Sequence, residues 1–379
     1  MANTLDDLMP KILARGLMTL RKRLSLPALV NRSYEDEAAR RGQTIDVPLP
    51  PAVQTRDVAP GVTPVAAPGI IEETVKIDLV NWKEVPIAFT DRDRLETIDD
   101  SVMMATDAAA NALAEDVNGS IFATYTDVYS SVGTAGTTPF AADYAQATAA
   151  RKALNNQKAP LQDRRMVIDP DAEENAINLS TFADSSFAAS GSVIIEGDIG
   201  RKLGFDWVMD QQVPTHTVGS LSSAPVVNGA HAAGVSTISI TAAGTGTIAL
   251  KAGDVINIAG DTQAYAVTAD VNIANAASGS VSIRPDLQIA TAGGEAVSLA
   301  ITADHVVNLG FNRDAFALAV RPLGQPRAPG TRVMTMVDSE SGLPLRLEVS
   351  RQNKQDYWSF DILWGVKCVR PELAVRVMG

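Results

Sequence analysis

The sequence predicts an α+β protein into which a small β-barrel domain is inserted. Three observations predict it: a proline-rich stretch between two β-rich segments, one long amphipathic helix, and a region of short alternating strands almost without basic residues. The chain has 379 residues, of which 46% are hydrophobic. It is therefore long enough for two or three domains with sizeable cores.

The first 41 residues predict a helix, a break and a second helical segment. Pro10 falls within the first apolar pattern and limits how regular that helix can be. The basic run Arg21–Arg23 is short. We therefore interpret it as a solvated helix face or a contact with an acidic neighbour, in preference to a nucleic-acid-binding site. The apolar residues at helical spacing are Leu5, Leu8, Met9, Ile12, Leu13, Leu17, Leu20 and Leu24.

The proline-rich stretch lies between the β-rich segments Thr44–Leu49 and Glu72–Phe89. Proline fixes φ and lacks a backbone donor, so this middle cannot be a helix or a central strand. A long extended loop inside a compact domain usually serves a function or a partner. We therefore expect an arm that a neighbouring molecule orders. Its prolines are Pro48, Pro50, Pro51, Pro60, Pro64 and Pro68.

Residues 97–129 predict a helix of about 30 residues, which is about 45 Å long at 1.5 Å per residue. Thr97 or Asp99 can cap its start, and acidic residues are enriched in its first turn. The apolar positions at helical spacing are Ile98, Val102, Ala105, Ala109, Ala112 or Leu113, Val117, Ile121, Phe122 and Tyr125. Such a helix serves as a structural spine.

Shorter elements follow the long helix. The patterns predict a helix over Phe140–Asn156, a strand over Arg165–Ile168, a helix over Asp171–Leu179 and a strand near Gly204–Met209.

At Thr215 the composition changes. The region Thr215–Ala303 is rich in Ala, Gly, Ser and Thr and contains only two basic residues, Lys251 and Arg284. Short alternating runs separated by glycine turns predict a small β-barrel or sandwich. Because the helix and strand pattern resumes at Asp304–Pro322, we interpret this region as an inserted domain.

The C-terminal part predicts further strands at Leu345–Ser350, Tyr357–Val369 and Leu373–Val377. In the second of them Trp358, Phe360, Ile362 and Trp364 alternate, which is typical of a half-buried strand.

Composition argues against several functions. A net charge of −12 disfavours tight binding of nucleic acid by the whole chain. The one cysteine, Cys368, excludes an internal disulfide and is expected to be buried. The three histidines, His216, His231 and His305, lack neighbours at metal-ligand spacing, so we expect them in turns or on the surface. We find no catalytic motif and expect no enzyme activity, cofactor, metal site or membrane segment.

Four segments, in this order, resemble the major capsid proteins of tailed double-stranded DNA phages, and in particular the P22-type coat proteins of the HK97-fold group. The resemblance covers nearly the whole chain, and Phe311–Pro322 is its most specific part. The segments are Trp82–Asp91, Gly197–Phe205, Phe311–Pro322 and Trp364-Gly365-Val366.

The resemblance implies an HK97-like fold with an N-terminal arm, an extended loop called the E-loop, a spine-helix peripheral domain and an axial domain. It implies an N-terminal arm at 1–41, the E-loop with flanking strands at 42–90, the peripheral domain at 91–139, the axial domain at 140–214 and 304–341, the inserted domain at 215–303, and returning strands at 342–379. The E-loop tip, Ala52–Gly69, would lie over an adjacent subunit. Its expected contact residues are Val53, Arg56, Asp57, Val62 and Val65.

The implied function is self-assembly into the icosahedral shell around the double-stranded DNA genome of a tailed phage. The implied partners are other copies in hexamers and pentamers, a separate scaffolding protein, a portal, and packaged DNA by proximity only. The implied location is the virion, reached by assembly in the host cytoplasm. The alternatives are an encapsulin-like compartment of the same fold or another virion structural protein.

Overall fold

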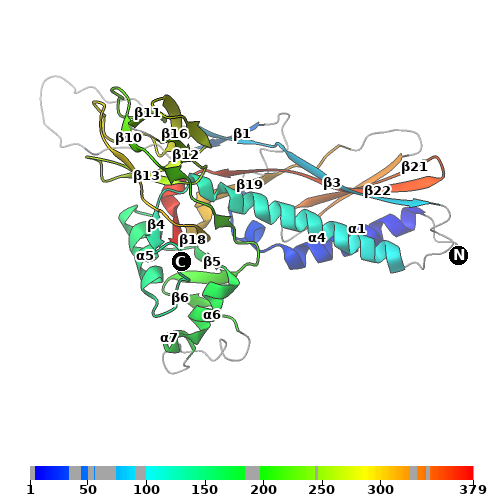
Figure 1. The fold of residues 1–379 in the computed structure, drawn as a ribbon. Coiled ribbons are helices and arrows are strands. Elements are labelled where there is room, and N and C mark those ends of the chain that lie inside the picture. The colour runs from blue at the N-terminus through cyan, green and yellow to red at the C-terminus, as the bar shows by residue number, and fades with distance from the viewer. Residues whose placement is uncertain are drawn as a thin grey trace, which may run out of the picture.

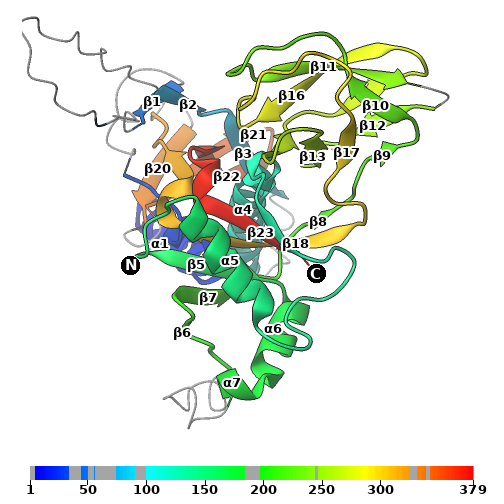
Figure 2. The ribbon, with the colours of Figure 1, turned by 90° about the vertical axis from the view of Figure 1, so that its left-hand side faces the viewer.

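The computed structural model describes residues 5–33, 44–49, 55, 74–90, 100–183, 197–243, 246–324, 331–338 and 342–378. Two helices and a long sheet form one end of the molecule, a second sheet with three helices forms the other, and a separate β-unit lies beside them (Figures 1 and 2).

Helix α1 (Leu5–Arg23) runs without interruption past Pro10 and ends before Pro27, which lies in a 3-10 turn, Leu26–Ala28. Residues 34–41 of the predicted second helical segment lie outside the described residues. Pro10 is the sixth residue of α1, so it removes one backbone hydrogen bond within the second turn. The helix is held by its apolar face, which is buried against α4 (Asp100–Ala123) and the long sheet. The buried residues are Met9, Ile12, Leu13, Leu17 and Leu20.

Charges on α1 pair with acidic neighbours. Arg15 binds Asp107 of α4 with Nη2 to Oδ2 at 2.7 Å. Arg21 donates to Asp338, with Nε to Oδ1 at 3.1 Å. For Arg21, the contact with an acidic neighbour predicted for the basic run is therefore confirmed.

The long helix α4 is confirmed, with Ala109, Leu113, Val117 and Ile121 buried as predicted. Its predicted start at Thr97 lies outside the described residues. Its α-helical part ends at Ala123, earlier than predicted, and continues as the 3-10 turn η2 (Thr124–Asp127). The hydroxyl of Thr124 donates to the carbonyl of Ile121 at 2.6 Å and so competes with the backbone there. The 24 residues of α4 span about 36 Å.

The long sheet has the strand order β19-β22-β21-β20, and β3 also pairs with β22. Its strands are β3 (Asn81–Thr90), β19 (Phe316–Val320), β20 (Thr331–Val337), β21 (Pro344–Gln352) and β22 (Gln355–Cys368). Helices α1 and α4 cover one face (Figure 1). The alternating residues of β22 are buried as predicted, and indole Nε1 of Trp364 donates to Oγ of Ser120 in α4 at 2.8 Å.

The second sheet has the order β4-β23-β18-β5-β7-β6, and β8 also pairs with β18. Its strands are β4 (Ser131–Gly133), β5 (Arg164–Ile168), β6 (Arg201–Lys202), β7 (Phe205–Met209), β8 (Thr215–His216), β18 (His305–Asn312) and β23 (Ala374–Met378). The helices beside it are α5 (Ala145–Asn156), α6 (Pro170–Asn178) and α7 (Ser180–Ala183). Helix α5 begins later than the predicted Phe140, because Phe140 has φ +64°, which an α-helix excludes.

The third unit, which we call the insert, consists of strands β9 to β17. Its larger sheet has the order β10-β11-β16-β14-β13-β17. The two ends of this sheet meet where Val226 pairs with Ala296 and the Val227 N–H donates to the Glu295 carbonyl at 2.9 Å. The sheet is therefore a nearly closed barrel, and its core, around Ile238, Tyr265 and Val281, is separate from the main core.

The insert's strands are β9 (Ser220–Leu221), β10 (Ala224–Val227), β11 (Thr237–Ala243), β12 (Ile248–Leu250), β13 (Val255–Ile258), β14 (Ala264–Val267), β15 (Val271–Ile273), β16 (Ser278–Arg284) and β17 (Val297–Leu299). The chain enters through β8 and leaves through β18, where His216 pairs with His305. The two connections therefore lie side by side, as expected of a domain inserted into a finished fold. Figure 2 shows the insert as a lobe beside the rest of the molecule, which we call the body.

Candidate functional site

The first candidate site is the base of the proline-rich arm. The first β-rich segment forms β1 (Thr44–Pro48), and the second, Glu72–Phe89, is divided between β2 (Thr74–Asp78) and β3 of the long sheet. Strands β1 and β2 pair antiparallel with Thr44 opposite Asp78. The Thr44 hydroxyl donates to Oδ1 of Asp78 at 2.8 Å. The two ends of the arm are therefore held together in one hairpin, which we call the arm hairpin.

The arm hairpin is anchored to the long sheet by one apolar face. Its buried residues Ile45, Val47, Ile77 and Leu79 pack against Ala317, Ala319 and Val369. At Gly365 in β22 the contact is so close that an added Cβ would lie 2.4 Å from the carbonyl oxygen of Asp78. Only glycine allows β2 to approach β22 at this distance.

The predicted contact residues of the arm tip are Val53, Arg56, Asp57, Val62 and Val65, and all five lie outside the described residues. Their role stays a prediction.

The second candidate site is the contact between insert and body, which we call the joint: Tyr125, His216, Asp254, His305 and Arg376. The prediction that the histidines lie in turns or on the surface is wrong for His216 and His305, which are 3% and 2% exposed. The spacing of the histidines along the sequence could not predict this burial, because the residues that surround them come from distant parts of the chain. Only His231 is partly exposed, and it accepts a hydrogen bond from the Ser239 N–H at 3.2 Å.

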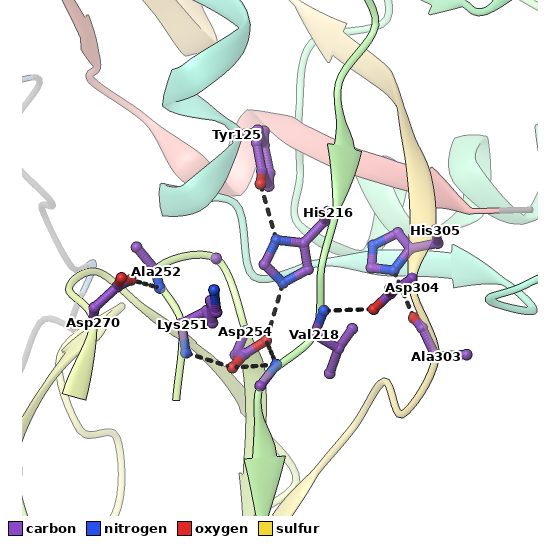
Figure 3. A network of polar contacts seen from close by, with 12 residues as sticks. Tyr125, His216, Val218, Lys251, Ala252, Asp254, Asp270, Ala303, Asp304 and His305 are labelled. Carbon is purple, nitrogen blue, oxygen red and sulfur yellow. Dashed lines mark hydrogen bonds and ion pairs between the residues drawn. The ribbon is translucent and has the colours of Figure 1, made fainter. Parts of the chain in front are cut away.

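His216 bridges body and insert (Figure 3). Its Nδ1 lies 2.9 Å from the hydroxyl of Tyr125, in η2, and its Nε2 lies 3.0 Å from Oδ1 of Asp254, in the turn before β13. A carboxylate only accepts, so we assign the proton of neutral His216 to Nε2 and let the Tyr125 hydroxyl donate to Nδ1. Asp254 also accepts from the N–H groups of Lys251, at 2.7 Å, and Gly219, at 3.2 Å.

His305 lies against His216 with ring centroids 5.4 Å apart. Its Nδ1 donates to the carbonyl of Ala303 at 3.1 Å, which leaves Nε2 unprotonated in the neutral ring. Within the described part of the chain this buried Nε2 has no hydrogen-bond partner. Burial lowers the pKa of His305, and the neighbouring His216 and Arg376 lower it further, although the Ala303 carbonyl opposes them.

Arg376 is fully buried beneath the insert. Its Nη1 donates to the carbonyl of Gly253 at 2.6 Å, and its guanidinium lies 5.2 Å from the centre of the Tyr125 ring. Burial lowers the pKa of Arg376 to about 10. The side chain therefore stays charged at neutral pH and joins the last strand to the insert.

Two further contacts surround the joint. Arg284 of the insert pairs with Asp127 of the body at 2.8 Å. A small apolar group, Val255, Ile301 and Met378, lies beside it. The interface between insert and body is thus largely polar.

Tyr125, His216 and Asp254 are hydrogen-bonded in series, as the members of a nucleophilic triad are, and the similarity ends there. Burial raises the pKa of Tyr125, with Arg376 opposing and Asp254 reinforcing the change. The hydroxyl therefore stays protonated and acts as a donor to His216. Among the described residues no group of three His, Cys, Asp or Glu side chains is arranged to hold a metal ion. Burial also raises the pKa of the Cys368 thiol, which lies in the core as predicted.

The long helix against a long sheet, the anchored arm hairpin and the second sheet form an HK97-like fold, which two solved phage structures share. The solved structure titled "Mycobacterium phage Che8" matches with a TM-score of 0.50 at 17% identity, over 92% of this chain and 89% of that one. The "Capsid structure of the Cyanophage P-SCSP1u" matches with a TM-score of 0.51 at 14% identity, over 89% and 84%. At these identities the likeness establishes the fold.

A third solved structure, "Crystal structure of virus-like particle from Pyrococcus furiosus", has a TM-score of 0.43 at 8% identity, over 97% of this chain and 98% of that one. No family model matches the chain, and no curated protein matches its sequence. Over the described residues, no helix is long and apolar enough to cross a membrane.

Proposed function

We propose that this chain is the major capsid protein of a tailed phage and assembles into the icosahedral shell that encloses its double-stranded DNA. The observation that carries the proposal is the HK97-like fold across about nine tenths of the chain, shared with a cyanophage capsid structure. The net charge of −12 fits a shell that encloses DNA without binding it tightly.

The arm is the proposed assembly element, and we assign the E-loop with its flanking strands to residues 42–90. Its base is fixed by apolar packing, and Pro48 lies opposite Thr74, so the two ends of the intervening 25 residues are held side by side. A stretch of this length reaches at most about 40 Å when it doubles back on itself. That reach is enough for Val53, Arg56, Asp57, Val62 and Val65 to contact an adjacent copy.

Such an arm makes a heterologous contact, in which one surface of a subunit meets a different surface of the next. Contacts of this kind close into rings when the rotation fits, as hexamers and pentamers require. Because each subunit gives one arm and receives another, many modest contacts add to a strong shell.

The domain assignments follow from the same proposal. The peripheral domain comprises 91–139 and the returning strands 342–379, and the axial domain comprises 140–214 and 304–341. The N-terminal arm is 1–41 and the inserted domain is 215–303. A separate scaffolding protein and a portal are the proposed partners, with assembly in the host cytoplasm and final location in the virion.

Electron microscopy of the protein produced with its scaffolding partner tests the proposal. We expect closed icosahedral particles with hexameric and pentameric units. Persistent monomers under these conditions would contradict it, and shells from infected cells that hold a protein cargo instead of DNA would favour the encapsulin-like alternative.

Deleting residues 52–69 tests the arm separately. The variant should remain a folded monomer, because the arm hairpin and both sheets lie outside the deletion, yet shell yield should fall by at least tenfold. Intact shells from this variant would refute the assignment of the arm. The matched variant keeps the arm at full length and replaces Val53, Val62 and Val65 by serine. This change should weaken assembly less than the deletion does.

A further inference from the structure

We infer that Arg376 positions the insert on the body, and that the insert reaches its final place only after the last strand of the chain, β23, has joined the second sheet. This inference is independent of shell assembly, since it concerns contacts within one subunit.

Strand β23 is the place where three parts of the chain meet. It pairs with β18, where Phe311 lies opposite Ala374, and runs parallel to β4, where Ser131 lies opposite Arg376. All five of its residues are buried. Removing β23 from the sheet would therefore separate β4 from β18 and would also remove Arg376 from the joint.

Arg376 is the member of β23 whose side chain forms a hydrogen bond with the insert. Its guanidinium is covered by the Tyr125 ring from the body and by the Gly253 carbonyl from the insert. A buried cation is costly unless hydrogen bonds and a suitable environment compensate for the lost water. The docked insert provides one such hydrogen bond, from Nη1 to the Gly253 carbonyl, while Nε and Nη2 have no hydrogen-bond partner among the described residues. An undocked insert would leave Arg376 hydrated and Gly253 without this donor.

The insert's turn fits the joint closely. Gly253 has φ +100°, and a Cβ added there would lie 3.1 Å from Cε1 of His216 and 3.1 Å from Cε2 of Tyr125. The turn is thus seated directly on the residues that Arg376 contacts, and a single methyl group is enough to disturb the fit.

The insert does not depend on the joint for its own core. Ile238, Tyr265 and Val281 belong to a cluster separate from the main core, and the larger sheet closes within the insert. The barrel can therefore form while the C-terminal strand is still missing. Docking has to wait, because Arg376 is carried by β23 and reaches the Gly253 carbonyl only when that strand is in the second sheet.

Hydroxyl-radical footprinting of the full chain tests the positioning role. In Arg376→Met we expect oxidation of His216 and Met378, both buried at the joint, to rise at least fivefold. Tyr265 in the insert core and Trp364 in the body core should keep their wild-type protection. Arg370→Met is the matched control, because Arg370 pairs with Glu372 at 2.8 Å away from the joint. Arg376→Lys keeps the charge but loses the planar group, and should restore protection only in part.

A second variant disturbs the joint from the insert side. Gly253→Ala should expose His216 and Met378 to the same degree while the body stays folded, and it decides the question if Arg376→Met does not fold. Unchanged protection of His216 and Met378 in Gly253→Ala, or in a folded Arg376→Met, would overturn the inference.

The order of events is tested by pulsed footprinting during refolding of the wild-type chain. Tyr265 in the insert and Phe311 in the body sheet should become protected before or together with His216. Protection of His216 ahead of Phe311 would show that the insert docks without the completed sheet and would overturn the proposed order.

Discussion

The hydroxyl of Tyr125 donates a hydrogen bond to Nδ1 of His216 across 2.9 Å, and this contact joins the 3-10 turn after the long helix to β8, the strand through which the chain enters the insert. It also fixes the tautomer of His216, because the opposite nitrogen faces the carboxylate of Asp254.

Replacing Tyr125 by Phe should remove this bond and leave Nδ1 of His216 buried without a donor. An unsatisfied buried acceptor costs about 1–3 kcal/mol, so the free energy of unfolding should fall by that amount in urea titrations. Tyr357→Phe is the control, since Tyr357 is 42% exposed and should tolerate the change. Equal stabilities of the wild type and Tyr125→Phe would mean that water replaces the hydroxyl.

His305 should make the subunit sensitive to acid. Its pKa is lowered in the folded state, so the unfolded chain binds the proton more readily. The stabilisation from a neutral His305 is complete above the unfolded pKa of about 6.5 and is lost as the pH falls below it.

The pH dependence is measured as the difference between wild type and His305→Gln. Between about pH 6.5 and 5 the free energy of unfolding of the wild type should fall faster than that of His305→Gln, by up to about 1.4 kcal/mol per pH unit. Parallel slopes for wild type and His305→Gln would contradict the lowered pKa.

Gly365→Ala should detach the arm hairpin without unfolding the subunit. The added methyl group would meet the carbonyl of Asp78 at 2.4 Å, so β2 has to move away from β22. Limited proteolysis should then cut near residues 44–49 and 74–78 several times faster, and shell yield should fall. Gly119→Ala, where nothing lies within 4 Å of the added Cβ, should be neutral or stabilise α4 by up to about 1 kcal/mol.

Trp364→Ala should destabilise the subunit by about 3–5 kcal/mol, the usual cost of removing a fully buried large aromatic side chain. The loss also leaves the hydroxyl of Ser120 without its indole donor. Thermal or urea unfolding measures the effect, and Leu161→Ala, at a 63% exposed position, serves as the control. A loss below about 1 kcal/mol would mean that the long helix and the sheet do not share one core.

Local patterns predicted most of the elements. The buried face of α4 through Leu113 and Val117 follows the helical period, and the buried side of β22 follows the two-residue period. The start of α5 was misplaced because a left-handed φ at Phe140 leaves no mark on hydrophobic spacing. Pro10 does not interrupt α1, because the apolar face of this helix is buried against α4 and the long sheet.

The sequence by itself determined the α+β class, the two strands that frame the proline-rich arm, the long helix and the interruption by a small β-unit. Each of these follows from residues close together in the chain. Only the tertiary structure decided that the two arm strands pair, that the insert's sheet nearly closes, and that Tyr125, His216, Asp254 and Arg376 meet. The physical reason is that burial and hydrogen bonding of a polar side chain depend on partners that folding brings from elsewhere, and His216 finds its partners 91 and 38 residues away.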